Sequence, residues 1–338
     1  TFPTNDCSSC MMGPKLVELA SHRDIHILTR TTVEGIDGEP GNFKLTVKRN
    51  PRFVLEDRCT GCGECAKVCP INVPADFNLA LNQRQAIYRH YPQAIPAAFA
   101  IDKRGVAPCK HACPAGISVQ GYVALIAQGR YQEALNLIKQ NNPLPAICGR
   151  VCNHPCEAAC NRGQIDKPIA TEFLHRFVAD LDLRNPSPYL PEKKESKGKK
   201  VAVIGAGPGG LAAGYYLAIE GYQVTIFEAM TEAGGWLRYG IPEYRLPRDI
   251  LKAEIDVIEN LGVEIRYGIR LGVEIKLEDL RKDGYEAIFV AIGTQRSTKL
   301  GVPGEDLPGV FFGGEFLKEV NSGKVVEFGQ RVAVVGGG

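Results

Sequence analysis

The sequence has 338 residues, of which 44% are hydrophobic and 23% charged, with a formal net charge of +2. This length predicts two or three domains, each able to bury its own core. A charge this close to zero gives no reason to expect a nucleic acid or an anionic membrane as partner. No stretch approaches the roughly 20 apolar residues that cross a bilayer, so no membrane span is expected. The chain starts at Thr1 and stops at Gly338 within a glycine run, which favours a piece of a longer protein.

The twelve cysteines all lie between Cys7 and Cys160. They form tight C-x2-C and C-x3-C groups, which is the spacing of metal ligands rather than of the disulfides of a small secreted protein. Such thiolates must stay free to bind metal, so a reducing cytoplasm is the expected setting.

The first region, residues 1–105, holds two cysteine groups and is expected to be a ferredoxin-like α+β region that binds clusters. Strand-like segments occur at residues 25–28 and 43–47, with a glycine- and proline-rich turn at residues 38–42 between them.

The second region, residues 106–185, is expected to be α-helical, because its apolar residues recur at i, i+3 and i+4, and its six cysteines make it a candidate [4Fe–4S] domain. A helical hairpin is predicted between Ser118 and Asn142, with a break at Gly129. The proline-rich and then charged stretch at residues 186–199 is typical of a solvated linker.

Beyond the linker, short buried strands alternate with helices, which is typical of a parallel α/β domain. We expect a Rossmann-like FAD-binding domain at residues 200–331 and the start of a truncated NAD(P)H-binding domain at residues 332–338.

The first cluster motif has the C-x2-C-x2-C-x3-C-P spacing of bacterial ferredoxins and consists of Cys59, Cys62, Cys65 and Cys69 before Pro70. Gly61 and Gly63 allow the backbone turns that bring three thiolates to one cubane, whose sulfurs accept N–H groups of the loop. Zinc is the alternative, although zinc sites usually combine two separated pairs. Cys69 could serve this cluster or another one.

Cys7 and Cys10 form a C-x2-C pair that resembles half of a cluster motif. The interpretation that we favour is cluster ligation. A redox-active dithiol and a pair of inert thiols are the alternatives.

The second cysteine region combines a C-x3-C-P motif with four cysteines spaced four apart, namely Cys109, Cys113, Cys148, Cys152, Cys156 and Cys160. Four such cysteines would line one helix face, but Pro155 interrupts the helix and residues 153–155 are expected to form a loop. Thiolates from a loop and its flanking turns can surround a cluster, and zinc remains an alternative.

Several segments here, among them Ile147-Cys148-Gly149-Arg150-Val151-Cys152 and Cys156-Glu157-Ala158-Ala159-Cys160, resemble the iron–sulfur domain of the glutamate synthase small subunit. Dihydropyrimidine dehydrogenase and the large subunit of NADH-dependent ferredoxin:NADP oxidoreductase share that domain. The resemblance runs from about residue 106 to residue 338. Residues 1–102, with Gly41-Asn42-Phe43-Lys44 and Tyr91-Pro92-Gln93-Ala94, resemble the ferredoxin insertion of the A-type heterodisulfide reductase polypeptide. The chain thus resembles a fusion of both families.

The resemblance to the glutamate synthase family implies two cubanes, one of which has three cysteines and one other ligand. Its positions match Cys113, Cys152, Cys156 and, for the fourth ligand, His175, since imidazole is a competent iron ligand. The alternative for His175 is a capping or surface histidine. Cys109 and Cys160 match two ligands of the other cubane, whose upstream cysteine pair is missing. Cys148 matches no ligand and could be a small buried hydrophobe.

A dinucleotide fingerprint begins where the expected strand at residues 201–204 runs into Gly205-Ala206-Gly207-Pro208-Gly209-Gly210 and a helix through Leu217. The cofactor-binding residues expected here are Gly205 for the tight turn, Gly207 for the approach of the pyrophosphate, Gly209, Gly210 for close helix packing, and Glu228 for the ribose hydroxyls. The helix N-terminus would bind the phosphates.

Three features assign this first site to FAD. Residues 332–338 open a second fingerprint, so the parent protein is expected to hold two dinucleotides, with NAD(P)H at the second site. Residues 288–294, including Gly293, resemble the strand that returns such a flavoprotein to its FAD domain. Residues 234–242 resemble a glutamate synthase family segment along the flavin, which implies contacts from Gly235, Trp236, Leu237 and Arg238.

The sequence therefore predicts an oxidoreductase that passes electrons between NAD(P)H, FAD and two to four [4Fe–4S] clusters. No residue need act as general acid or nucleophile. The expected partners are other redox subunits or ferredoxin-like carriers in a hetero-oligomeric complex. The alternatives are an ordinary glutamate synthase small subunit, which the ferredoxin insertion disfavours, and an electron-wiring scaffold without turnover of its own.

Overall fold

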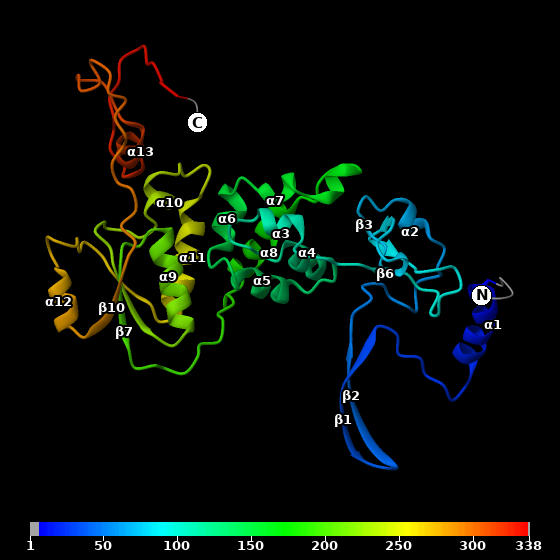
Figure 1. Ribbon diagram of the computed structural model, residues 1–338. Helices are drawn as coiled ribbons and strands as arrows, with labels where there is room; N and C mark the ends of the chain where they lie inside the picture. The colour runs from blue at the N-terminus through cyan, green and yellow to red at the C-terminus, as the bar shows by residue number, and fades with distance from the viewer. Residues whose placement is uncertain (1–6, 337–338) are drawn as a thin grey trace. The chain divides into compact units, whose positions relative to one another are not determined.

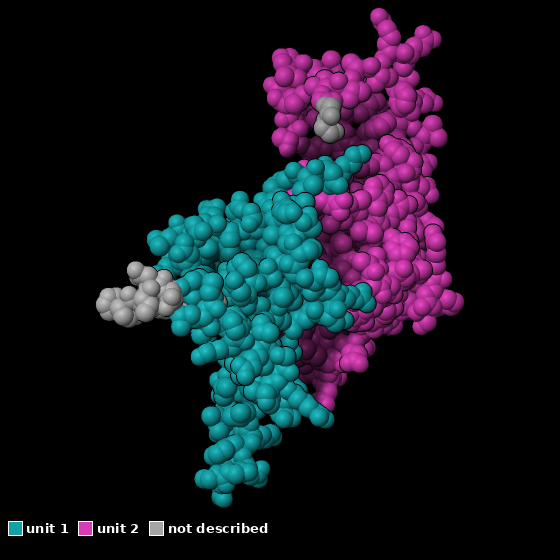
Figure 2. Space-filling model, turned by 90° about the vertical axis from the view of Figure 1, so that its right-hand side faces the viewer, with its two compact units in different colours: residues 1–106, 164–167 teal, residues 107–163, 168–338 magenta. Residues whose placement is uncertain are grey.

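The computed structural model describes residues 7–336 of the chain (Figure 1). The chain divides into two compact units, residues 1–106 with 164–167 and residues 107–163 with 168–338 (Figure 2). The predicted Cys7 and Cys10 are described, whereas Thr1 to Asp6, Gly337 and Gly338 lie outside the described residues.

The first unit begins with helix α1 (Ser8–Ser21) and a long antiparallel hairpin of β1 (Thr31–Glu39) and β2 (Asn42–Arg49). The predicted turn is present, because only Pro40 and Gly41 separate the two strands. The strand expected at residues 25–28 is wrong, since these residues adopt no regular secondary structure. The register explains why: Arg49, the last residue of β2, pairs with Thr31, so β2 ends before it could pair with residues 25–28.

The rest of this unit consists of very short elements around the first cysteine motif. They are α2 (Glu64–Lys67), β3 (Asn72–Pro74), the 3-10 helix η1 (Asp76–Asn78), β4 (Gln83–Gln85), β5 (Ile87–Tyr88) and β6 (Ala100–Ile101). The strands β3 and β4 pair antiparallel, as do β5 and β6. The buried core beneath them contains Phe99 and several alanines, so little apolar area holds this region together.

The second unit opens with a helical region, as the sequence predicts. Its helices are α3 (Pro108–Ala112), α4 (Val119–Ala127), α5 (Tyr131–Lys139), α6 (Pro145–Val151), α7 (Pro155–Ala158) and α8 (Thr171–Leu183), with η2 (Asn161–Gln164) between α7 and α8. The predicted helical hairpin is α4–α5, and Gly129 turns between them with φ of +73°. Residues 152–154 form a loop after α6, close to the loop expected at residues 153–155. Pro155 itself is the first residue of α7, because proline fits the first turn of a helix.

Two close contacts hold α6 against α8. A Cβ atom at Gly149 would lie 2.7 Å from Cα of Arg176, so only glycine permits this crossing. Next to it, the Arg150 guanidinium donates to both oxygens of Asp180 at 2.7 and 2.9 Å. Because α6 carries Cys148 and α8 carries His175, this crossing fixes how the two helices present their side chains.

The α/β part of the second unit has a parallel sheet in the order β10–β7–β8–β9. Its strands are β7 (Lys200–Ile204), β8 (Gln223–Phe227), β9 (Glu264–Arg266) and β10 (Tyr285–Val290), and its helices are α9 (Pro208–Ile219), α10 (Trp236–Tyr239), α11 (Arg248–Asn260), α12 (Leu277–Lys282) and α13 (Gly313–Asn321). The predicted strand–loop–helix unit is therefore present as β7–α9. Residues 332–336 adopt no regular secondary structure, and the rest of the second fingerprint is not described. Among the helices of the described chain, none has the length and apolar character of a membrane span.

Candidate functional site: a dinucleotide loop and two cysteine groups

The glycine loop between β7 and α9 has the geometry that the fingerprint requires. Gly205 has φ of +101°, and a Cβ there would lie 2.6 Å from the Ala291 carbonyl oxygen. At Gly210 a Cβ would lie 1.8 Å from the carbonyl oxygen of Gly205, so this glycine lets the helix start against its own loop. At Gly207, by contrast, a Cβ would meet only Cα of Gly235 at 3.8 Å, and the space above the loop is open. The loop thus fits the pyrophosphate of a dinucleotide, with Gly207 facing the open side.

Three predicted segments meet at the carboxyl ends of the central strands. The N–H of Gly234 donates to the Ala206 carbonyl at 2.8 Å, and that of Ala291 to Ile204 at 2.8 Å. Trp236 lies at the same edge, where its indole N–H donates to the Thr294 carbonyl at 2.9 Å. Ligands of open α/β sheets bind at this edge. The predicted Gly209, Gly235 and Gly293 therefore lie in segments around one site.

Leu237 and Arg238, which the resemblance assigned to the cofactor, have other contacts. Leu237 packs against the main hydrophobic core of the domain. The Arg238 side chain donates to the Ala233 carbonyl at 2.9 Å and to Glu232 at 3.0 Å. Both residues hold the segment in place.

Glu228 follows β8 as expected and is 7% exposed. One of its carboxylate oxygens accepts the N–H of Ala206 at 2.6 Å and the other accepts that of Met230 at 2.8 Å. The carboxylate thus fixes the glycine loop directly. Each of its oxygens keeps a further lone pair for a ribose hydroxyl.

We expect Glu228→Ala to destabilise the fold as well as the bound dinucleotide. Two hydrogen bonds to a charged acceptor are lost, and the free energy of unfolding should fall by roughly 3 kcal/mol. Denaturant unfolding measures the loss, and Glu228→Gln, which keeps one acceptor oxygen, should lose less. Unchanged unfolding of the alanine variant would contradict the role of Glu228 in fixing the loop.

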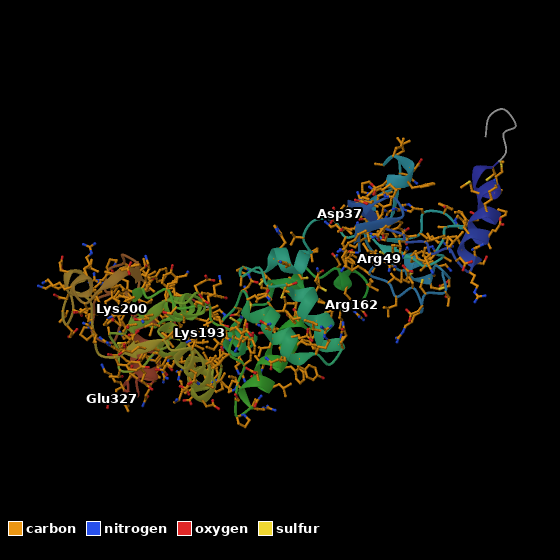
Figure 3. All side chains as sticks on the ribbon, turned by 90° about the horizontal axis from the view of Figure 1, so that it is seen from below. Asp37, Arg49, Arg162, Lys193, Lys200 and Glu327 are labelled. Atoms are coloured by element: carbon orange, nitrogen blue, oxygen red, sulfur yellow. The ribbon has the colours of Figure 1, made fainter. Side chains whose placement is uncertain are left out.

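A separate cavity of about 450 Å³ lies at the opposite ends of the strands, where β7 and β8 begin. Basic side chains line it, including Lys193 and Lys200, which are labelled in Figure 3. Because the glycine loop lies at the other ends of these strands, this cavity is not the dinucleotide site.

The first cysteine motif forms a loop that runs into α2. Gly61 and Gly63 both have positive φ, of +70° and +87°, as the predicted turns require. The N–H of Phe99 donates to Sγ of Cys59 at 3.4 Å. The backbone N–H of Glu64 and then the Thr60 hydroxyl lower the pKa of the Cys62 thiol. Donors aimed at sulfur are the environment that thiolate ligands need.

The remaining cysteines of this unit lie as follows. Cys65 is in α2, and Sγ of Cys69 lies 3.6 Å from the Ile71 carbonyl oxygen. Cys7 caps α1 and hydrogen-bonds to Cys10, and this contact raises the pKa of the Cys10 thiol. Neighbouring thiols fit either cluster ligation or a dithiol.

The second cysteine region brings Cys113, Cys152 and Cys156 together. Burial raises the pKa of the Cys156 thiol, and the nearby charges of Cys113 and Cys152 raise it further. The backbone N–H of His154 donates to Sγ of Cys152 at 3.3 Å. Sγ of Cys156 lies 3.2 Å from the Thr171 hydroxyl, which places this cysteine against the first turn of α8.

His175 lies one turn further along α8, only 7% exposed. Its ring stacks on Tyr122 with 5.7 Å between centroids, and Tyr122 packs in the same cluster as Cys109, Cys113 and Cys156. Burial lowers the pKa of His175 to about 4, so the ring is neutral near pH 7. Its Nε2 is buried without a hydrogen-bond partner. A buried neutral imidazole with an unpartnered nitrogen fits a metal ligand better than a capping or surface histidine.

The other cysteines of this region differ in their surroundings. Cys109, in α3, packs against the same cluster, and Cys160 follows α7. Cys148 is partly buried in α6, its thiol donates to Asn142 at 3.6 Å, and burial raises its pKa to about 11. Such a thiol is a poor ligand, which fits the predicted small buried hydrophobe.

Within residues 7–336, no three His, Cys, Asp or Glu side chains are grouped as single-ion ligands. The ligands of a cubane lie further apart than those of one ion, because iron and sulfide stand between them.

One residue that contacts the segment at residues 234–242 gives no signal in the sequence. Arg248, in α11, donates to the carbonyls of Leu237 at 3.2 Å and Ile241 at 3.0 Å. It also donates to the Asn321 side chain at 3.1 Å, and Asn321 donates to the Tyr239 carbonyl at 3.0 Å. These two side chains fix α10 against α11 and α13.

Three family models match the chain. Residues 53–74 match the 4Fe-4S binding domain, residues 93–186 match dihydropyrimidine dehydrogenase domain II with its 4Fe-4S cluster, and residues 199–338 match pyridine nucleotide-disulphide oxidoreductase. The chain carries iron–sulfur and dinucleotide-binding domains together. The prediction of iron–sulfur clusters and a dinucleotide cofactor in one chain is confirmed.

Curated relatives agree with these matches. The chain is 46% identical over 244 residues to the NADPH-Fe(3+) oxidoreductase subunit beta of Geobacter sulfurreducens, covering 70% of this chain and 36% of the relative. It is 45% identical over 260 residues to the NADP(+)-dependent formate dehydrogenase subunit beta of Moorella thermoacetica, covering 69% and 36%. It is 36% identical over 235 residues to the NAD-dependent dihydropyrimidine dehydrogenase subunit PreT of Escherichia coli, covering 69% and 56%.

The chain thus spans about a third of the length of the first two of these relatives. Among solved structures, Mycobacterium tuberculosis FprA in complex with NADPH aligns with a TM-score of 0.34 and 24% identity, over 37% of this chain and 29% of that chain. This likeness is too low to carry an argument.

Proposed function

We propose that the protein passes electrons between NAD(P)H, FAD and [4Fe–4S] clusters as one member of a larger redox complex. The proposal rests on the presence of two sites in one unit. One is the open glycine loop at the carboxyl ends of the parallel strands, and the other, in the helical part, is a group of cysteines with His175, whose Nε2 has no hydrogen-bond partner. The cysteine motif around Cys62 adds a further cluster site in the other unit.

The chain's own residues supply binding and positioning. The loop from Gly205 to Gly210 and the N-terminus of α9 would hold the FAD pyrophosphate, and Glu228 would hold a ribose hydroxyl. FAD, when bound, supplies the exchange between two-electron and one-electron chemistry. Cys113, Cys152, Cys156 and His175 would hold one cubane, and Cys59, Cys62, Cys65 and Cys69 another. No side chain is required to donate or accept a proton in the transfer itself.

The partner assignment rests on two supports. The relatives are named as subunits, which supports a hetero-oligomeric complex with other redox subunits or ferredoxin-like carriers. The resemblance of residues 1–102 to the A-type heterodisulfide reductase polypeptide supports an electron hub rather than an ordinary glutamate synthase small subunit. The C-x2-C and C-x3-C spacing of the cysteines is that of metal ligands, which supports a reducing, cytoplasmic setting.

The proposal is tested by the composition of anaerobically prepared protein. We expect iron and acid-labile sulfide in near-equal amounts, at least two cubanes per chain, and FAD. Cys62→Ser should remove one cluster and leave FAD in place, because the two sites belong to different domains. Zinc without sulfide would contradict the proposal, as would protein that holds clusters but no flavin.

A further inference from the structure

A buried polar cluster outside the cofactor sites lies where α11 packs against the helical part of its unit. It consists of Glu254, Lys139, Asp182, Asn142, Cys148 and Tyr215. Glu254 is 3% exposed, Lys139 4%, Asn142 6% and Asp182 7%. Charged groups are almost never buried to this extent without a partner or a function.

Glu254 is the member of this cluster without a partner for its charge. One carboxylate oxygen accepts the N–H of Ala146 at 2.9 Å, and the other is buried without a partner. The neighbouring cations are engaged elsewhere. Lys139 lies 3.8 Å from Asp182 and donates to the Tyr189 carbonyl at 3.3 Å, and Arg150 is paired with Asp180.

The helices packed around Glu254 present charges of both signs to it. Helix α5 presents Lys139, α8 presents Asp182, α6 presents Arg150 and Cys148, and α9 presents the Tyr215 hydroxyl. Burial raises the pKa of Glu254 to about 7, and Lys139 and Arg150 lower it only in part. The Glu254 carboxyl group is therefore partly protonated near pH 7, where a small change of nearby charge alters the fraction that is protonated.

Two further polar atoms of the cluster, the Tyr215 hydroxyl and the Asn142 amide nitrogen, are also buried without partners. In proteins, ordered water commonly satisfies buried polar atoms of this kind. The other end of the Asn142 side chain accepts the Cys148 thiol, so the cluster continues along α6.

Helix α6 connects this cluster to the second cysteine region. Ala146, which donates to Glu254, and Cys152, which caps the helix, are six residues apart, or roughly 9 Å at the α-helical rise. Two unit charges about 10 Å apart at an effective dielectric of about 20 change each other's affinities by roughly tenfold.

We propose that Glu254 is a redox-linked proton-binding site for the cluster held by Cys113, Cys152, Cys156 and His175. This inference rests on the proposed function. For each electron that the reduced flavin supplies to that cluster, the Glu254 carboxylate would take up one proton from solvent, and it would release that proton on reoxidation. The added negative charge is thus compensated inside the protein.

The experiment is a potentiometric titration of the cluster, followed by electron paramagnetic resonance, at pH values from about 5.5 to about 8.5. In the intact protein the midpoint potential should fall as pH rises through neutrality, by at most about 59 mV per unit for one electron and one proton. Glu254→Gln, which keeps an acceptor for Ala146, should make the potential independent of pH. Asp256→Asn removes a half-exposed carboxylate from the same helix and should keep the slope.

A second measurement does not depend on a variant. The infrared difference spectrum of the intact protein, reduced minus oxidised, should show the C=O band of a newly protonated carboxylic acid. A pH-independent potential in the intact protein, an unchanged slope in Glu254→Gln, or no carboxylic acid band would overturn the proposal. No cluster signal at all would instead refute the proposed function on which it rests.

Discussion

Gly207→Ala should remove FAD from the protein while leaving its fold and its iron intact. Gly207 has φ of −75° and ψ of −178°, an extended conformation that alanine adopts without strain. The added methyl group has only Gly235 as a protein neighbour, at 3.8 Å, so the polypeptide accommodates it. The same methyl group would enter the space of the pyrophosphate. Overpacking of about 1–3 kcal/mol corresponds to roughly 5- to 150-fold weaker binding.

The measurements are the flavin released on denaturation, the iron content and the thermal midpoint. Gly210→Ala is the matched control, because its methyl group would lie 1.8 Å from the Gly205 carbonyl oxygen within the protein itself. That variant should lose stability along with FAD. If Gly207→Ala kept its full complement of FAD, the dinucleotide would have to bind elsewhere.

His175→Ala should convert one four-iron cluster into a form that readily loses an iron. The substitution removes the only nitrogen ligand that we assign to the Cys113, Cys152 and Cys156 site, so one iron is held by no protein atom. The oxidised variant should show the paramagnetic signal of a three-iron cluster, which the intact protein lacks. His175→Cys should restore four irons, and its thiolate should lower the cluster's potential, since replacing cysteine by neutral histidine raises potentials in Rieske centres.

The control for His175 is His154→Asn. The His154 side chain is 44% exposed and pairs with Glu172 at 2.7 Å. Its backbone has φ of +41°, which asparagine tolerates better than most residues. The cluster should survive this change. An unchanged cluster in both His175 variants would mean that the unpartnered Nε2 of His175 faces no iron.

The sequence predicts well those features that follow from local spacing. The turn at Pro40-Gly41, the break at Gly129 and the β7–α9 fingerprint each depend on a few adjacent residues whose backbone needs are specific. The strand expected at residues 25–28 fails because strand formation also needs a partner in register, and register is a property of two segments.

The site residues divide in the same way. Gly205, Gly207 and Gly210 could be assigned from the motif, whereas the bonds from Glu228 to Ala206 and Met230 depend on how the loop folds back. Arg248 gives no sequence signal. Glu254 does give one, because it lies three residues after Leu251 and four before Ile258 on the buried face of α11, where a carboxylate is out of place.

The central claim, that electrons pass between FAD and the clusters, is tested most directly by following both centres in one sample. Protein loaded with FAD and iron is reduced either at the flavin by light or at the clusters by a small reductant. The samples are then frozen at increasing times for absorbance and paramagnetic resonance. Both samples should reach the same distribution of electrons between flavin and clusters. If each sample instead stayed reduced only at the centre where reduction began, the claim would be contradicted.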